Sequence, residues 1–250
     1  MKKELVSILV FIVCAMFAEA TAMAQGIIVH KKNGEEIILP YSTLDSIETY
    51  TEDVEEIDGH ECVDLGLSVK WATCNVGAYS PEEYGGYYAW GETEEKSDYD
   101  WDTYKWCKGT DDTMTKYCTH SGDGTFDNRR TLTSSDDVAT VKWGSKWRMP
   151  TKEEMKELVE DCTWTCTTQN EVNGMKVTGP NGNSIFLPAA GLRYGTDLYY
   201  RGSTGYYWSA TLDEGLSYRA YSLLFYSGLI SCDGYWYDRS YGRSVRPVTE

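Results

Sequence analysis

Tyrosine dominates the last part of the chain, from residue 194 to residue 241. Eleven of the 20 tyrosines fall there, at positions 194, 199, 200, 206, 207, 218, 221, 226, 235, 237 and 241. Tyr and Trp side chains offer large, rigid contact areas at a low cost in conformational entropy, and the interleaved Ser, Gly and Asp residues supply adaptable hydrogen bonds. The segment therefore has the composition of a recognition surface more than that of an active site. The alternative is a plain set of strands, which aromatic residues also favour.

Residues that could bind a metal are sparse by comparison. His30, His60 and His120 are scattered and no Cys-X-X-Cys pair occurs, so the sequence does not predict a zinc site. The acidic segments Asp111-Asp112 and 123–127 are candidates for calcium, but neither has EF-hand spacing, and solvated loop charges explain them more simply. We therefore predict no metal and no cofactor.

Paired carboxylates are the remaining catalytic hypothesis, because the chain contains 39 Asp and Glu residues and many glycosidases use two such groups. The pair Asp136-Asp137 is explained more simply as the start of a helix, where carboxylates interact favourably with the helix dipole. The sequence therefore predicts no catalytic residues and a protein that is not an enzyme.

The N-terminus carries the pattern of an export signal. Lys2 and Lys3 precede an apolar run over 5–17, and a small-residue site at 22–24 precedes Gln25. Residues 1–24 are predicted to be a signal peptide, which places the rest of the chain across the inner membrane: at the cell surface, in the periplasm or secreted. The apolar run is too short to span a membrane comfortably, and the residues before Cys14 lack the small side chains of a lipidation site.

The charge of the chain restricts the kinds of partner that it can bind. The formal net charge is −16 and the isoelectric point is about 4.6, whereas binding to phosphate backbones depends on clustered Lys and Arg. We therefore expect neither nucleic acid nor an anionic membrane as a partner, and no membrane span in the mature chain.

The cysteines leave the redox state open. Seven of the eight cysteines lie beyond the predicted signal peptide, an odd number that leaves at least one thiol free or bound to another chain. Oxidising compartments permit disulfides, and the nearest local pairs are Cys107 with Cys118 and Cys162 with Cys166. Buried reduced thiols are the alternative.

The elements predicted before residue 130 are mostly strands and loops. Residues 25–50 form a small β-hairpin module around Asn33-Gly34, and the acidic run 51–57 reads as a linker. The large domain, residues 58–250, opens with a second hairpin over 61–77 and a strand candidate over 85–92. A long loop region follows from 93 to 130.

Helices are predicted only in the middle of the large domain. Thr151 and Glu154 form a capping box ahead of apolar residues at helical spacing, and 136–141 predicts a second, short helix. Short strands follow, broken by turns at Asn173-Gly174 and Asn181-Gly182. The fold class is therefore α+β rather than a sandwich.

Several segments of the large domain together carry a family resemblance. They are residues 63–72 (VDLGLSVKWA), 88–92 (YAWGE), 147–151 (WRMPT), 186–191 (FLPAAG), 207–209 (YWS) and 244–248 (SVRPV). In aggregate the chain from about 58 to 250 resembles the Fibrobacter succinogenes major paralogous domain, a family common in exported proteins of gut and rumen Bacteroidetes. Residues 27–50 resemble a short β module often found ahead of such domains.

The same Arg-Met-Pro-Thr segment and Arg-Pro ending resemble two further groups. These are the formylglycine-generating enzymes and the variable proteins of diversity-generating retroelements, which share a C-type-lectin-like fold. The resemblance implies that fold for 58–250: short helices, antiparallel strands and long loops, with the binding residues on an exposed face of the C-terminal half. Copper chemistry would need a cysteine pair near the C-terminus, where this chain has only Cys232. The Glu-Pro-Asn and Trp-Asn-Asp triplets of calcium-dependent lectins are also absent.

The sequence therefore predicts a non-catalytic, cell-surface ligand-binding module for an unknown protein or glycan. The expected ligand-binding residues are Tyr218, Arg219, Tyr221, Ser231, Asp233, Tyr235, Trp236 and Tyr237. One alternative is a structural envelope or fimbria-associated module whose aromatic residues pack internally. A second alternative, an enzyme related to the formylglycine-generating group, lacks the cysteine pair.

The resembling segments also predict the core. The residues expected there are Trp71, Trp90, Trp147, Leu187, Trp208, Val245 and Pro247. Arg148 and Arg246 sit inside these apolar segments, so we predict that they tie strand ends together through hydrogen bonds rather than take part in chemistry.

Overall fold

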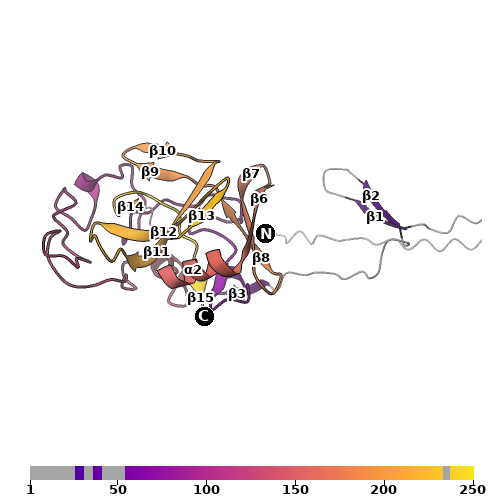
Figure 1. The fold of residues 1–250 in the computed structure, drawn as a ribbon, viewed down its shortest axis with the longest axis horizontal. Helices are drawn as coiled ribbons and strands as arrows, with labels where there is room; N and C mark the ends of the chain where they lie inside the picture. The colour runs from indigo at the N-terminus through magenta and orange to yellow at the C-terminus, as the bar shows by residue number, and fades with distance from the viewer. Residues whose placement is uncertain (1–25, 31–35, 41–53, 233–236) are drawn as a thin grey trace, which may run out of the picture. The chain divides into compact units, whose positions relative to one another are not determined.

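The computed structural model describes residues 26–30, 36–40, 54–232 and 237–250 (Figure 1). The chain divides into two compact units, Met1–Thr51 and Glu52–Glu250. The predicted signal peptide, residues 1–24, lies outside the described residues. Within the described ranges, no helix combines the length and the apolar character needed to cross a membrane.

The first unit contains one β-hairpin. Strand β1 (Gly26–His30) pairs antiparallel with β2 (Glu36–Pro40), with Gly26 opposite Pro40 and His30 opposite Glu36. This pairing is the one predicted from the two alternating runs. The expected turn at Asn33-Gly34 lies outside the described residues.

The second unit begins with a strand where a linker was predicted. Residues Val54–Ile57 form β3, which pairs with β4 (His60–Val63), so the linker expected over 51–57 is wrong for its last four residues. Asp58 and Gly59 both have positive φ angles, 49° and 85°, as a two-residue hairpin turn requires. The sequence pattern did not predict this strand, because its acidic residues are typical of a linker. An edge strand tolerates such charges on its exposed side.

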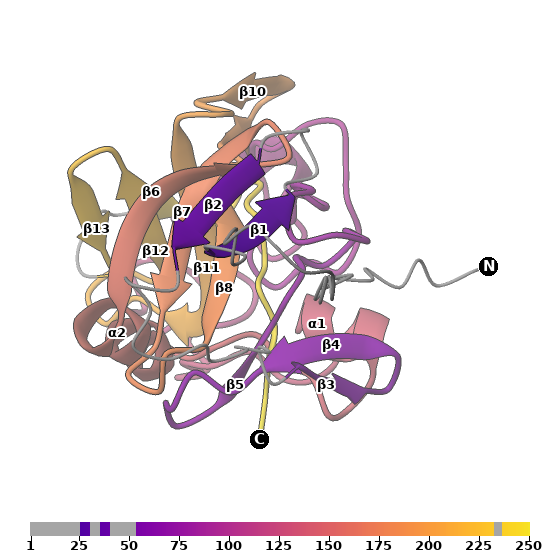
Figure 2. The same ribbon diagram turned by 90° about the vertical axis from the view of Figure 1, so that its right-hand side faces the viewer.

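The predicted second hairpin is confirmed and joins the C-terminal end of the unit. Strand β4 pairs with β5 (Lys70–Ala72), and β5 pairs with β15 (Val248–Thr249), which gives the sheet order β15-β5-β4-β3. Figure 2 shows β3, β4 and β5 beside the C-terminus. The strand candidate 85–92 makes only a bridge, from Tyr88 to Arg243, and 93–130 is loop apart from the short 3-10 helix η2 (Trp101–Thr103).

Both predicted helices form. Helix α1 (Val138–Trp143) is capped by Asp137, whose Oδ1 accepts hydrogen bonds from the backbone N–H groups of Ala139 and Thr140. Helix α2 (Lys152–Asp161) begins with the predicted capping box. The Thr151 hydroxyl accepts from the Glu154 N–H at 3.2 Å, and the Glu154 carboxylate accepts from the Thr151 N–H at 2.8 Å.

Antiparallel strands make up the rest of the second unit. The three-stranded sheet is β6 (Thr163–Gln169), β7 (Val172–Thr178) and β8 (Ser184–Pro188). The hairpin is β9 (Leu192–Tyr194) with β10 (Asp197–Tyr199). The four-stranded sheet is β11 (Thr204–Leu212), β12 (Arg219–Tyr226), β13 (Leu229–Ser231) and β14 (Tyr237–Asp238). The architecture is thus α+β, with antiparallel sheets and two short α-helices.

One of the two predicted Asn-Gly turns is wrong. Asn173-Gly174 lies inside β7, and the turn between β6 and β7 is made by Asn170 and Glu171, whose φ angles are 45° and 67°. Gly174 is needed for close packing instead, because a Cβ there would lie 2.3 Å from the Leu187 carbonyl oxygen. The turn at Asn181-Gly182 does form, between β7 and β8.

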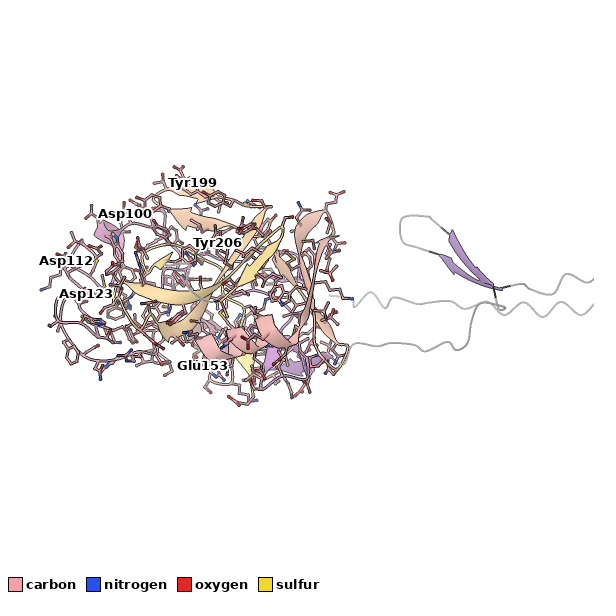
Figure 3. The ribbon with its side chains drawn as sticks, in the orientation of Figure 1. Asp100, Asp112, Asp123, Glu153, Tyr199 and Tyr206 are labelled. Atoms are coloured by element: carbon pink, nitrogen blue, oxygen red, sulfur yellow. The ribbon has the colours of Figure 1, made fainter. Side chains whose placement is uncertain are left out.

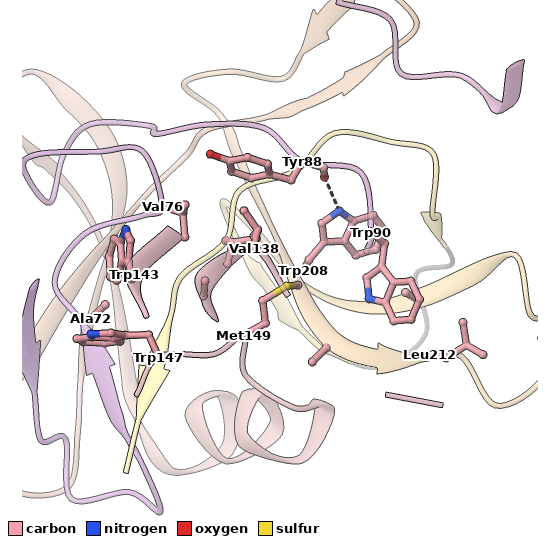
Figure 4. Packing of buried hydrophobic residues seen from close by; sticks show 14 of the residues in the cluster. Ala72, Val76, Tyr88, Trp90, Val138, Trp143, Trp147, Met149, Trp208 and Leu212 are labelled. Carbon is pink, nitrogen blue, oxygen red and sulfur yellow. Dashed lines mark hydrogen bonds between the residues drawn. The ribbon is translucent and has the colours of Figure 1, made fainter. Parts of the chain in front are cut away.

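The predicted core is confirmed. All seven expected residues are buried, and Figure 4 shows four tryptophans packed in one of the clusters. Three indoles donate to carbonyl oxygens: Trp208 to Tyr88, Trp90 to Ser209 and Trp147 to Ile57. Burying an indole together with an acceptor keeps its apolar surface out of water and leaves no unsatisfied donor.

The segment from 239 to 249 runs through this core and makes bridges to Tyr88, Arg193, Tyr207 and Arg148 (Figure 2). It carries three arginines that are at most 1% exposed: Arg239, Arg243 and Arg246. Arg246 donates to Asn75 Oδ1 and to the carbonyl oxygens of Ala72, Thr73 and Phe186. The predicted structural role of Arg246 is therefore confirmed.

Arg148 has the same kind of role at the start of α2. Its guanidinium makes two hydrogen bonds to the Glu154 carboxylate, at 2.6 and 2.7 Å, and a third to Glu250 at 3.0 Å. Burial alone would raise the pKa of Glu154, but Arg148 and the Thr151 N–H outweigh it and hold that pKa below its usual value. The ion pair thus supports the helix cap.

Replacement of Trp147 by alanine should lower the free energy of unfolding by about 3–5 kcal/mol, because it leaves a large cavity in the core. Urea denaturation followed by circular dichroism measures the change. Tyr79→Ala is the matched control, since Tyr79 is 96% exposed and its loss should change stability by less than about 0.5 kcal/mol. A Trp147→Ala protein as stable as the wild type would contradict this description of the core.

Glu154→Gln should be less stable than the wild type at pH 7 by about 1–2 kcal/mol. Because the pKa of Glu154 is lowered in the folded state, its contribution is present above its unfolded pKa, near 4.5, and is lost as the pH falls through the folded pKa. The difference between the two proteins should therefore shrink below about pH 4.5 in urea titrations at several pH values. A difference that stays constant down to pH 2 would contradict the ion-pair role.

Candidate recognition surface

The strand pairing in the sheet of β11, β12, β13 and β14 decides which tyrosines share a face, with β13 and β14 both pairing with β12. Side chains alternate between the two faces of a strand, and directly paired residues point to the same face. Leu224 of β12 lies opposite Tyr206 and Ser231, and Ala220 lies opposite Tyr237. Tyr206, Ser231 and Tyr237 therefore lie on one face.

The predicted ligand-binding residues do not all lie on that face. Arg219 and Tyr221 occupy the odd positions of β12, together with Leu223 and Phe225, which pack in the cluster that contains Met155 and Leu158 of α2. The Lys152 ammonium lies 3.8 Å from the centre of the Tyr221 ring. Tyr221 thus covers the helix side of the sheet, away from Tyr237.

The other predicted residues are partly covered or outside the described ranges. Tyr218 packs against a separate cluster that contains Tyr99 and Tyr104, and the Arg219 guanidinium lies 5.1 Å from its ring. The predicted residues that the structure describes are all half-buried. Asp233, Tyr235 and Trp236 lie outside the described residues.

A different set of tyrosines is exposed. Tyr200 is 60% exposed, Tyr194 44%, Tyr226 42% and Tyr199 39%. With Tyr206, Tyr237 and Tyr241 they form a group that we call the tyrosine face. Figure 3 shows Tyr199 and Tyr206 on the side of β9 and β10, opposite Glu153 of α2.

Ring contacts connect the tyrosine face. The centroids of Tyr199 and Tyr200 are 6.1 Å apart, those of Tyr200 and Tyr206 6.4 Å, and those of Tyr206 and Tyr237 5.5 Å. Tyr194 and Tyr241 form a second pair at 4.8 Å. Tyr206, Tyr237 and Tyr241 also pack in one cluster with Leu192 and Leu224. The exposed rings therefore stand on a shared apolar base.

The backbone at Tyr200 is strained in a way that presents its side chain. Its φ is 59°, a left-handed conformation that bulky residues rarely adopt. The Tyr200 carbonyl oxygen accepts hydrogen bonds from the Ser203 hydroxyl and from the N–H groups of Ser203 and Thr204. Backbone strain held by such bonds concentrates at functional sites, and here it positions the most exposed ring of the tyrosine face.

Arg243 forms the base below these rings. Its guanidinium carbon lies 3.6 Å from the centre of the Tyr237 ring, 4.2 Å from that of Trp208 and 5.2 Å from that of Tyr206. One nitrogen donates to the Ser222 hydroxyl, while Nε and Nη2 have no acceptor among the described residues. Burial lowers the pKa of Arg243 to about 9. Because a buried cation attracts aromatic faces, Arg243 fixes the orientation of the rings around it.

The acidic groups considered for metal binding or catalysis are engaged in local structure. Asp123 accepts from the Ser217 N–H, and Asp127 accepts from the N–H groups of Tyr117 and Cys118. Asp136 is hydrogen-bonded to Lys116 and Tyr117, and Asp137 caps α1. Within the described part of the chain, no group of three or more His, Cys, Asp or Glu residues could hold a metal ion.

Four of the thiols are held in environments that disfavour reactivity. All seven cysteines from 62 to 232 are free, so neither candidate local disulfide forms and the reduced-thiol alternative holds in this structure. Cys107 and Cys118 donate instead to separate carbonyl oxygens, of Trp101 and His120. Burial raises the pKa of Cys62, Cys74 and Cys107 and raises that of Cys162 to about 11, which disfavours the nucleophilic thiolate.

Comparison with known proteins gives one match. A family model described as a domain of unknown function, DUF8237, matches residues 157–248. That range runs from α2 to β15 and includes the whole tyrosine face. No curated protein and no solved structure matches the chain.

The two buried arginines should respond differently to replacement by methionine. Arg246→Met leaves an amide and three carbonyl oxygens without donors, so we expect a loss of about 3–5 kcal/mol of stability. Arg243→Met loses one hydrogen bond and the ring contacts but also removes an unpaired buried charge, so we expect a loss below about 2 kcal/mol. Urea denaturation of both variants checks the order, and a larger loss for Arg243→Met would contradict it.

Proposed function

We propose that this chain is an exported, non-catalytic recognition module that presents the tyrosine face to a protein or glycan partner. The observation that carries the proposal is the series of ring contacts from the exposed Tyr199 and Tyr200 to Tyr206 and Tyr237, which pack around the buried cation of Arg243. Single exposed aromatic residues are ordinary, but a connected exposed patch is typical of interaction sites. Tyrosine is also enriched among the residues that dominate binding energy.

Sequence features support the proposal. The N-terminal pattern is that of an export signal. Residues 58–250 resemble the Fibrobacter succinogenes major paralogous domain, and we propose for them the C-type-lectin-like fold that this resemblance implies. In the retroelement variable proteins that this chain also resembles, the binding face lies in the C-terminal half. The tyrosine face also lies in the C-terminal half of this chain.

A structural envelope or fimbria-associated module is the second candidate. It is favoured by the tyrosines that are covered, because Tyr207 is fully buried and Tyr218, Tyr221 and Tyr237 are half-buried. The exposed rings of Tyr194, Tyr199 and Tyr200 have no such role within the unit. An enzyme related to the formylglycine-generating group is the weakest alternative, since Cys232 is buried and is the only cysteine of the C-terminal region.

The double variant Tyr199→Ala/Tyr200→Ala should abolish binding to a partner found in a screen of extracellular proteins and immobilised glycans. Each central aromatic is expected to contribute more than about 2 kcal/mol to binding. Exposed side chains contribute little to folding, so the melting temperature should stay within about 2 °C of the wild type.

Tyr79→Ala is the control, because it removes an equally large exposed ring from outside the tyrosine face. If the double variant keeps full affinity, the site lies elsewhere. If it unfolds, the tyrosines are structural and the second candidate gains support.

A further inference from the structure

A groove lies next to the tyrosine face, between β6 and β7 on one side and the end of β12 on the other. It encloses about 380 Å³, within the range of about 300–1,000 Å³ typical of small-ligand sites. Its lining residues are Cys166, Thr167, Thr168, Asn173, Gly174, Met175, Ala189, Gly202, Ser203, Phe225, Tyr226 and Ser227.

The lining carries no charged side chain, although 25% of the residues in this chain are charged. The base is apolar and rigid: Met175, Ala189 and Phe225 are at most 4% exposed. The rim is polar and consists of hydroxyl groups and the Asn173 amide. A phosphate, carboxylate or ammonium group would find no counter-charge there, so the groove suits an uncharged polar ligand.

Part of the rim is fixed in position before any ligand binds. The Thr168 hydroxyl donates to Asn173 Oδ1 at 2.9 Å, and Asn173 Nδ2 donates to the Gly202 carbonyl oxygen at 3.1 Å. Ser203 is held by its bond to Tyr200. The Ser227 hydroxyl makes no hydrogen bond to the described residues, so it can exchange hydrogen bonds with a ligand.

We propose that this groove binds an uncharged saccharide, at a second site beside the tyrosine face. A sugar ring combines an apolar C–H surface with hydroxyl groups along its edge. The C–H surface matches the apolar base, and the edge matches the Thr, Ser and Asn groups of the rim. The inference does not depend on a partner for the tyrosine face.

The test begins with a glycan array of neutral glycans and their acidic counterparts, such as lactose and sialyllactose. Neutral glycans should bind, and the best of them is then titrated calorimetrically against the full chain. Thr168→Val, an isosteric change at an exposed strand position that faces the groove beside Asn173, and Asn173→Ala should each weaken binding at least about 5-fold.

Thr165→Val is the matched control, because Thr165 is exposed on the same strand and does not line the groove. It should bind like the wild type, and so should Tyr199→Ala/Tyr200→Ala, which separates this site from the tyrosine face. Exposed Cys166 gives a second measurement, since bound saccharide should slow its alkylation by iodoacetamide.

Three outcomes would overturn the proposal. These are the absence of neutral binders, a preference for acidic glycans, and equal affinity of Thr168→Val, Asn173→Ala and the wild type. A saccharide that binds but is lost only in Tyr199→Ala/Tyr200→Ala would assign the sugar to the tyrosine face instead.

Discussion

Burial of three guanidinium groups on one segment is the constraint on which the second unit depends. Arg239, Arg243 and Arg246 follow one another along residues 239–246, and each is at most 1% exposed. A buried cation is tolerated only where donors find acceptors or rings face the charge. Each arginine therefore requires a shell of other segments around it, and those shells together account for much of the architecture.

The three shells recruit different parts of the chain. Arg246 donates hydrogen bonds to carbonyl oxygens at the end of β5 and on β8. Arg239 donates to carbonyl oxygens of Lys116, Tyr117 and Ser217, and so anchors the long loop region against the sheet. Arg243 is surrounded by aromatic rings and has the fewest hydrogen bonds of the three. Of these three arginines, Arg243 alone has guanidinium nitrogens without a hydrogen-bond partner among the residues that the structure describes, and the surface proposed for recognition lies above it.

Local patterns in the sequence predicted the parts of the fold that local forces determine. The capping box at Thr151, the start of α1 and the hairpins over 27–39 and 61–72 were all found, because caps and alternation act within a few residues. Asn173-Gly174 was wrongly assigned to a turn, because glycine is needed at 174 for a different reason. A Cβ there would collide with Leu187 and Phe186 on the neighbouring strand. The strand at 54–57 was missed because its charges resembled a linker.

The candidate site was predicted less well, for a related reason. Composition identified the tyrosine-rich segment, but the exposure of each tyrosine depends on the strand register. A shift of one residue in that register moves every side chain of the strand to the other face. Tyr221 and Tyr237 look alike in the sequence, and only the pairing of β12 shows that they lie on opposite faces. Tyr199 ends a short hairpin and Tyr200 follows it, and the strands of this hairpin have only three residues each, too few for alternation to be recognised.

The position of residues 239–249 has a consequence for when the second unit can fold. Arg246 bonds to Ala72, 174 residues earlier in the chain, so the first sheet cannot gain its last strand until this segment is present. Long-range pairing of this kind slows folding. Residues 239–249 therefore act as the closing element of the second unit, whose core is complete only once they have joined the earlier segments.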